Sequence, residues 1–212
     1  MTRSRILLLL LLFGFGCTRD ESAPGAADSA ADAQAAHVAE VVAAGGVVDS
    51  ILPVGESLRR FRADIPERPD TLRRASTSLD ELVARWATAV SERDIEALNA
   101  MVIDRAEFAW LYYPDSPMSK PPYEMPPGLL WSQIMANSDE GAKQLLVRFG
   151  GRSLKVRGLS CQPKKSAGRN WMHEQCDVRA SVDGTSIGKL RLFGSVIERD
   201  GRFKFLGYAN SL

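Results

Sequence analysis

His173 is the residue in the C-terminal half of this chain with the clearest capacity for acid–base chemistry. The sequence contains one other histidine, His37, far to the N-terminal side. A neutral imidazole can act as a general base, but it needs a neighbouring group that orients it. Side chains alternate along a strand, so Trp171, His173 and Gln175 share one side and Glu174 points to the other. His173 is therefore a weak catalytic candidate that fits a surface or lining position better.

Cys161 and Cys176 have the spacing of a cross-strand disulfide. They flank a polar loop, and two antiparallel strands whose loop is centred near Gly168 would place them opposite each other. In an oxidising compartment such an even pair forms a disulfide, which the chain-entropy model values at about 3 kcal/mol for a loop of this size. The alternative is two buried free thiols. With these cysteines paired, the sequence offers no metal-ligand cluster, and we expect no cofactor.

The segment from residue 108 to residue 131 is unusually rich in aromatic side chains and in proline. Its aromatic residues with a polar tip are Trp110, Tyr112, Tyr113, Tyr123 and Trp131. Such side chains combine a large apolar area with a hydrogen-bonding group, which suits a wall that binds a ligand or a partner. The alternative is core packing, with the aromatic rings anchoring the loop against its prolines.

Cys17 ends a short apolar run at the N-terminus. Arg3 and Arg5 precede an apolar stretch that is too short to span a bilayer, which takes about 20 residues. A positive start, a short apolar region and small residues before a cleavage point are typical of a secretory signal. The small residue Gly16 directly before Cys17 resembles a bacterial lipoprotein signal, although Gly14 stands where that pattern usually has leucine. An ordinary cleaved signal with an incidental cysteine is the alternative.

The lipoprotein resemblance implies that residues 1–16 are removed and that Cys17 carries the lipid. A diacylglycerol and an N-acyl chain together give stable anchoring, because they supply more than one buried chain. Thr18 follows the cysteine, where an aspartate would resemble an inner-membrane retention signal. We therefore expect an extracytoplasmic protein held at the periplasmic face of the outer membrane rather than at the inner membrane.

Three further regions follow Cys17. Residues 17–50 are rich in alanine, and most of them lack large apolar side chains, so we expect a flexible tether, with residues 37–48 forming a helix or a strand. Residues 51–75 predict a short helix near 56–62 and then a connector that contains prolines. The compact domain is expected over residues 76–212.

Charge excludes one class of partner. The net charge is +1 and charged residues make up 25% of the chain, so there is no broad basic field for nucleic acid. One local basic group, Lys164, Lys165 and Arg169, lies in the loop between the two C-terminal cysteines. We expect it to be a solvated hairpin end rather than an anion site.

The first part of the domain is predicted to be helical. Ser78 and Glu81 have the spacing of a capping box, and apolar residues then recur at three- and four-residue steps to Val90. After a polar corner at 91–94, a second short helix follows. Residues 104–113 fit either a helix capped by Asp104 or a strand. Six prolines over 114–127 predict an irregular loop, and a further helix then runs to Phe149.

The last part of the domain is predicted to be a sheet. Strand-like segments lie near 154–159, 171–182, 187–197 and 203–208. Asp183-Gly184 and Asp200-Gly201 are hairpin turn signals between them. This order predicts an α+β fold in which N-terminal helices pack on a curved C-terminal antiparallel sheet of about four strands.

Residues 82–102 resemble the opening of nuclear-transport-factor-2-like (SnoaL-like) domains. Those domains begin with a long helix, a polar corner that holds an aspartate, here Asp94, and a second short helix. The ending, residues 197–212, resembles their last hairpin, so the resemblance covers roughly 78–212. It implies a cone of sheet and helices that often holds a ligand cavity. The aromatic and proline-rich stretch 108–127 departs from the family, which usually has a strand pair there.

The resemblance also implies two site residues. Trp86 stands where steroid-isomerase-like members carry a tyrosine that stabilises an oxyanion, but an indole has no hydroxyl, and core packing is the alternative for it. Asp115 lies nearest to the proton-abstracting aspartate of those enzymes and is a weak catalytic candidate. Members of this family include isomerases, hydrolases and binding modules, so the fold alone selects no function.

Together these observations favour a membrane-anchored extracytoplasmic binding or scaffold protein over an enzyme. Its expected partners are the membrane, through the lipid anchor, and either a small apolar ligand or an envelope protein. The alternative is a SnoaL or steroid-isomerase-like enzyme that acts on a small exported molecule. A third hypothesis is an assembly module that forms a homodimer through its sheet face.

Overall fold

The computed structural model describes residues 33, 36–37, 39–41, 43–45 and 52–212. The chain divides into two units, 1–51 and 52–212. The predicted signal at 1–16 and the predicted lipidation site Cys17 lie outside the described residues, as does most of the predicted tether. The described residues between 33 and 43 are helical, which agrees with the helical alternative for the start of 37–48. Within the part of the chain that the structure describes, no helix combines the length and apolar character needed to cross a bilayer.

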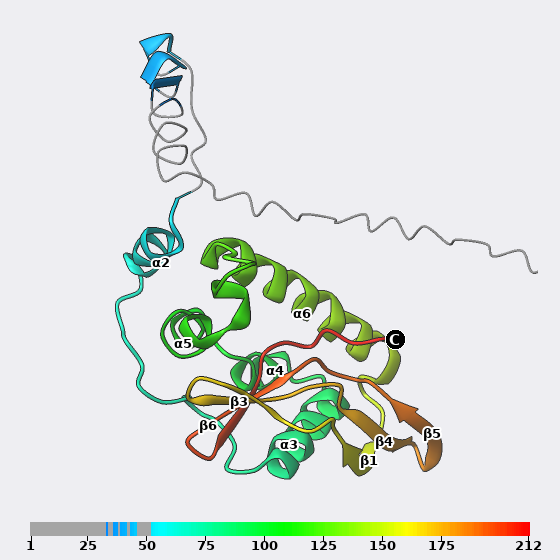
Figure 1. Cartoon of the computed structure of the whole chain (residues 1–212). Coiled ribbons are helices and arrows are strands. Elements are labelled where there is room, and N and C mark those ends of the chain that lie inside the picture. The colour runs from blue at the N-terminus through cyan, green and yellow to red at the C-terminus, as the bar shows by residue number, and fades with distance from the viewer. Residues whose placement is uncertain (1–32, 34–35, 38, 42, 46–51) are drawn as a thin grey trace, which may run out of the picture. The chain divides into compact units, whose positions relative to one another are not determined.

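Residues 52–119 and 127–149 supply the helical part of the second unit (Figure 1). Its elements are α2 (Val54–Arg62), α3 (Leu79–Glu92), α4 (Ile95–Met101), α5 (Arg105–Glu107), the π-helix η1 (Phe108–Tyr112), the 3-10 turns η2 (Tyr113–Asp115) and η3 (Pro117–Ser119), and α6 (Pro127–Phe149). The helical alternative for 104–113 is thus the one found, because the Asp104 side chain caps α5 in a capping box with Glu107.

The start of α3 differs in one detail from the predicted capping box. Ser78 Oγ accepts the hydrogen bond from the Glu81 amide at 3.1 Å, as predicted. The Glu81 carboxylate, however, accepts from the amide and hydroxyl of Thr77, each at 2.7 Å, instead of from the amide of Ser78. The carboxylate therefore satisfies a donor one residue before the cap.

The C-terminal part is antiparallel sheet, as predicted, but it has more strands than predicted. The strands are β1 (Leu154–Ser160), β2 (Lys165–Ala167), β3 (Asn170–His173), β4 (Asp177–Val182), β5 (Thr185–Leu190), β6 (Val196–Arg199) and β7 (Arg202–Phe205). They form a three-stranded sheet, β1-β4-β5, and a four-stranded sheet, β2-β3-β6-β7. A single sheet of about four strands is therefore wrong for the residues described.

The extra strands arise because three chain segments are interrupted as they pass from one sheet to the other. The interruptions at 161–164, 174–176 and 191–195 separate β1 from β2, β3 from β4, and β5 from β6. β3 pairs with β6 in one sheet and β4 pairs with β5 in the other, so the neighbouring segments stay neighbours across the break. The predicted meander order is thus kept, with a break that alternation of apolar residues does not reveal.

The disulfide between Cys161 and Cys176 is present at this break. Ser160 pairs with Asp177 on one side of it, and Lys165 pairs with Met172 on the other. The same register therefore runs through both sheets and places the two cysteines opposite each other. The predicted pairing is confirmed. The bridge joins the two chain segments between the end of the β1–β4 pairing and the start of the β2–β3 pairing.

Two hydrophobic clusters fill the interior. The larger one joins α3, α4 and the C-terminal half of α6 to the three-stranded sheet and to β6 and β7, and in it Trp86 packs edge-on against Phe193. The smaller one joins η1, α2 and the start of α6 to β3 and β6, with Phe108 and Ile197 fully buried. Leu72 of the predicted connector is also buried in this cluster, so residues before 76 contribute to the core.

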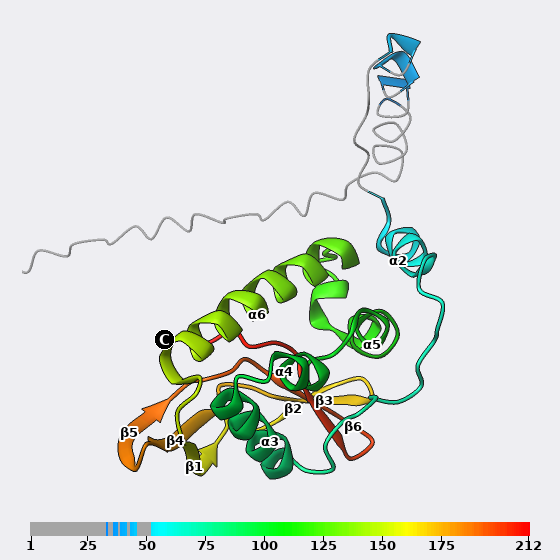
Figure 2. The same ribbon diagram turned by 180° about the vertical axis from the view of Figure 1, so that it is seen from behind.

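The C-terminal segment after β7 runs beside α6 in both views of the fold (Figures 1 and 2). The Tyr208 amide donates to Ser138 Oγ of α6 at 3.1 Å, and the Tyr208 hydroxyl donates to the Leu98 carbonyl at 2.8 Å. Gly141 is buried in α6 where this segment crosses, and a Cβ atom there would collide with the Tyr208 carbonyl. The close crossing therefore requires glycine at position 141.

We expect Gly141→Ala to destabilise the domain by about 2 kcal/mol, because the cost of overpacking exceeds the gain of about 1 kcal/mol in helix propensity. Gly128→Ala in the first turn of the same helix is the matched control, since its Cβ atom would lie 3.9 Å from the Phe61 ring, an ordinary contact. Urea unfolding of the two variants tests this. A Gly141 variant as stable as the Gly128 variant would contradict the close crossing.

Candidate functional site

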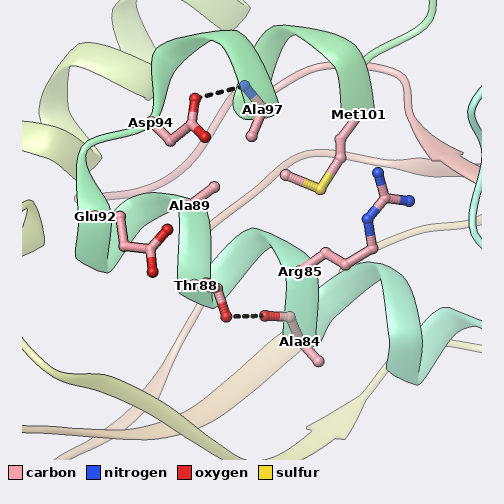
Figure 3. A pocket seen from close by; sticks show the side chains of 8 residues that line it. All are labelled: Ala84, Arg85, Thr88, Ala89, Glu92, Asp94, Ala97 and Met101. Carbon is pink, nitrogen blue, oxygen red and sulfur yellow. Dashed lines mark hydrogen bonds between the residues drawn. The ribbon is translucent and has the colours of Figure 1, made fainter.

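A groove between α3 and α4 is one surface pocket with polar groups in its wall. It has a volume of about 410 Å³. The side chains that line it come from both helices and from the corner between them (Figure 3). They are Ala84, Arg85, Thr88, Ala89, Glu92, Asp94, Ala97 and Met101.

Most polar groups of this groove already serve the backbone. Asp94 Oδ1 accepts from the Ala97 amide at 2.8 Å and caps α4, and the Thr88 hydroxyl donates to the Ala84 carbonyl at 3.2 Å. Arg85 donates to Ser76 Oγ at 2.9 Å. Because Asp94 caps α4, Thr88 bonds within α3 and Arg85 holds Ser76, the groove offers a ligand few free polar groups.

A second pocket, also of about 410 Å³, has a different character. We call it the arginine pocket. It is lined by Arg68, Pro69, Asp70, Trp110, Leu111, Arg169 and Arg199. Its volume lies within the range of small-molecule sites, about 300–1,000 Å³. Three arginines and one aspartate line it, in a chain whose net charge is only +1. Guanidinium groups are therefore the main charged groups of its lining.

Arg199, at the end of β6, is the most buried of the three arginines. Its side chain is 8% exposed, and its Nη1 donates to Asn170 Oδ1 at 2.9 Å and to the Leu111 carbonyl at 3.4 Å. Asp115 Oδ2 lies 3.8 Å from the same nitrogen. The Nε atom of Arg199 is buried and has no hydrogen-bond partner in residues 52–212. A buried guanidinium with incomplete hydrogen bonding is costly, so a bound anion would compensate it.

Arg169 is placed by a tight contact at the turn between β2 and β3. Gly168 has φ +60°, and a Cβ atom there would collide with the Asp115 carboxyl group. The same carboxylate accepts from the Arg169 amide at 3.2 Å. The Arg169 guanidinium donates to Asp200 at 2.8 Å. Asp115 therefore holds the turn in place and also lies beside Arg199.

Trp110 forms the aromatic part of the wall. It belongs to the π-helix η1, a rare geometry that occurs frequently at functional sites. The guanidinium carbon of Arg62 lies 3.7 Å from the ring centroid and that of Arg68 lies 4.8 Å from it. Arg62 also donates to the Ala109 carbonyl at 2.7 Å, which ties α2 to η1. The indole Nε1 of Trp110 is buried and has no partner among the described residues.

The charge around Trp110 is poorly balanced. Burial lowers the pKa of Arg62, and the neighbouring Arg68 lowers it further. Neither arginine forms an ion pair with a carboxylate in the part of the chain that the structure describes. An anion near these two guanidinium groups would therefore reduce their mutual repulsion.

The predicted aromatic wall is not assembled at one site. Tyr112 and Tyr113 are buried, burial raises the pKa of both, and the Tyr113 hydroxyl donates to the Met125 carbonyl at 2.6 Å. Trp131 packs on Phe108, and Tyr123 is exposed. Only Trp110 of this set lines the arginine pocket. The core-packing alternative fits the burial of Tyr112 and Tyr113.

Trp86 and His173 occupy different environments. Trp86 is fully buried and packs edge-on against Phe193 at 5.4 Å, which fits its core-packing alternative. His173 Nε2 lies 2.8 Å from Glu198 Oε2 on the neighbouring strand β6. The sequence did not identify this partner, because the pairing of β3 with β6 decides it.

The acidic member of this pair is held in its charged form. Burial would raise the pKa of Glu198, but hydrogen bonds from His173 and Lys164 outweigh burial and lower it. Lys164 lies 3.0 Å from the same carboxylate. The pair lines neither the arginine pocket nor the groove between α3 and α4.

No group of three or more histidine, cysteine, aspartate or glutamate side chains among the described residues is arranged to hold a metal ion. Comparison of the chain with protein-family models, with curated proteins and with solved structures found no match. The site must therefore be interpreted from its own geometry.

Sequence reasoning missed Arg68, Asp70 and Arg199 and regarded Arg169 as a solvated hairpin end. Arginines are common beside turns and at strand ends, so the presence of an arginine at these positions did not indicate a binding site. Only the tertiary fold brings the connector, η1, the β2–β3 turn and β6 to one pocket.

Proposed function

We propose that this chain is a lipid-anchored extracytoplasmic protein whose domain binds a small anionic ligand in the arginine pocket. The observation that carries the proposal is the convergence of three arginines on one pocket beside Trp110, with one of them almost fully buried and incompletely hydrogen-bonded. Guanidinium groups bind carboxylates and phosphates through charge-assisted hydrogen bonds. The aromatic and apolar wall of Trp110, Leu111 and Pro69 suits an apolar part of the same ligand.

The domain is further proposed to be a nuclear-transport-factor-2-like module. Support comes from the order of its elements, in which α3, the corner at Asp94 and α4 precede an antiparallel meander. The division of the meander into two sheets is compatible with the curved sheet of such modules. Ligand binding in a pocket is compatible with that fold, but the pocket, not the fold, selects the function.

An enzyme of the SnoaL or steroid-isomerase type is the alternative. The hydrogen bond between His173 and Glu198 favours it, because a histidine oriented by a carboxylate can act as a base. Against this, neither residue lines the arginine pocket, and Asp115 is engaged by the Arg169 amide. A binding function therefore has the stronger support.

Removal of Arg68 is the test of the anion site. Arg68→Gln is expected to weaken binding of 3-phenylpropionate about tenfold, because a charge-assisted hydrogen bond contributes about 1.5–3 kcal/mol. Arg68 is exposed and makes no ion pair within residues 52–212, so the fold should be unaffected. Arg157→Gln, an exposed arginine of β1, is the matched control and should bind as the wild type does. Isothermal titration calorimetry gives both affinities, and equal loss in both variants would contradict a specific site.

Replacement of Cys17 is the test of the anchor. Cys17→Ser should release the protein from membranes, because no other lipid attachment site is proposed. Detergent phase partition of the wild type and the variant measures this release. Ser50→Ala is the control and should stay in the detergent phase. Membrane retention of the Cys17 variant would count against the lipoprotein proposal.

A further inference from the structure

Asp70 is the acidic exception in the arginine pocket. It lies in the same lining as Arg68, Arg169 and Arg199. Its carboxylate is exposed and makes no hydrogen bond or ion pair with any residue of 52–212, although three arginines line the same pocket. Asp115 and Asp200 already pair with Arg199 and Arg169. Asp70 is thus not needed to neutralise those two arginines.

An anion alone would not benefit from this carboxylate, because like charges repel across a small pocket. A ligand that carries both an anionic and a cationic group would interact favourably with both parts of the lining. Its carboxylate would pair with the guanidinium groups, and its ammonium would pair with Asp70.

We propose that the ligand class of the arginine pocket is a small zwitterion, an amino acid or short peptide with a free amine and a free carboxylate. This inference rests on the proposed anion-binding function and adds the ammonium subsite at Asp70. The apolar side of the pocket, Pro69 and Leu111, would receive the side chain of the ligand. The pocket volume of about 410 Å³ is sufficient for a molecule of this size.

The test compares three probes of one shape on the full chain by isothermal titration calorimetry. Phenylalanine carries both charges, 3-phenylpropionate lacks the amine, and phenethylamine lacks the carboxylate. Phenylalanine should bind about tenfold more tightly than 3-phenylpropionate, the factor expected for one charge-assisted hydrogen bond, and phenethylamine should bind most weakly. Without an acidic subsite the order of the first two would be reversed, because the arginines repel the ammonium.

Asp70→Asn supplies the second measurement. The variant should lose the preference, so that phenylalanine binds no more tightly than 3-phenylpropionate, while the affinity for 3-phenylpropionate is kept or improved. Asp139→Asn, an exposed aspartate of α6, is the matched control and should retain the tenfold preference.

The outcomes separate this inference from the function on which it rests. Equal or weaker binding of phenylalanine by the wild type, or a preference that survives in Asp70→Asn, overturns the zwitterion and leaves the anion site intact. Absence of binding by both phenylalanine and 3-phenylpropionate, or tightest binding of phenethylamine, overturns both. The Arg68→Gln experiment with 3-phenylpropionate tests the anion site without any amine present.

Discussion

Lys204→Met is expected to destabilise the domain by about 3–5 kcal/mol, because it leaves a buried carboxylate without its cation. Lys204 is 2% exposed and Glu107 is fully buried, and their Nζ and Oε2 atoms lie 2.7 Å apart. The Glu107 carboxylate also accepts from the amides of Arg73 and Asp104 at 2.5 and 2.9 Å. Methionine keeps most of the volume of the lysine stem, so lost packing contributes little to the effect.

Urea unfolding of the full chain measures this loss. Lys189→Met is the matched control, since Lys189 forms an exposed ion pair with Asp177 at 3.0 Å. Exposed pairs contribute about 0–1 kcal/mol, so the control should stay close to the wild type. If the Lys204 variant were no less stable than the Lys189 variant, the buried pair would not exist in solution. The pair also joins α5 to β7, so its loss should loosen the contact between the helical part and the sheet.

Loss of the disulfide is the second large effect. The double replacement of Cys161 and Cys176 by alanine is expected to reduce the free energy of unfolding by about 3 kcal/mol, through the greater entropy of the unfolded chain. The bridge lies where the strands leave one sheet for the other, so it also fixes the register between Ser160–Asp177 and Lys165–Met172. Amide exchange should therefore rise first at Gln162, whose amide donates to the Glu174 carbonyl at 3.1 Å beside the bridge.

Dithiothreitol provides the control for this experiment. It should lower the stability of the wild type to that of the double variant and leave the variant unchanged. Mass spectrometry after alkylation of the unreduced protein should show no added label on Cys161 or Cys176. Two labels, or a wild type whose stability does not respond to reduction, would contradict the bond.

Local features of the sequence determined the elements of the domain. The caps at Ser78 and Asp104, the apolar periodicity of α3 and the turns at Asp183 and Asp200 act over a few residues, so they can be read without the fold. The cysteine pair was also predictable, because one hairpin register fixes which residues face each other across its loop. The fold class followed from the order of helices before strands.

The break in the strands and the burial of Lys204 depended on the fold. Alternation along β7 marks Phe203 and Phe205 as the inward side, which predicts a solvent-facing Lys204 between them. The structure buries Lys204 instead, because α5 covers the opposite side of the strand and presents Glu107 there. The alternation of apolar side chains shows which face of a strand packs on the core. It does not show whether a helix also covers the opposite face.

The candidate site was decided by tertiary structure alone. The sequence proposed Trp110 as part of an aromatic binding wall, whereas the structure places it in the lining of the arginine pocket. The sequence also proposed Asp115 as a weak acid–base candidate, and in the structure its carboxylate accepts from the Arg169 amide. Arg68 and Asp70 lie together in the connector before α3, whereas Arg199 lies far from them in the sequence at the end of β6, and no motif links them. Short-range patterns specify helices, strands and turns because those depend on neighbouring residues. A pocket of converging charges depends on how the finished elements pack, and therefore only the three-dimensional structure revealed it.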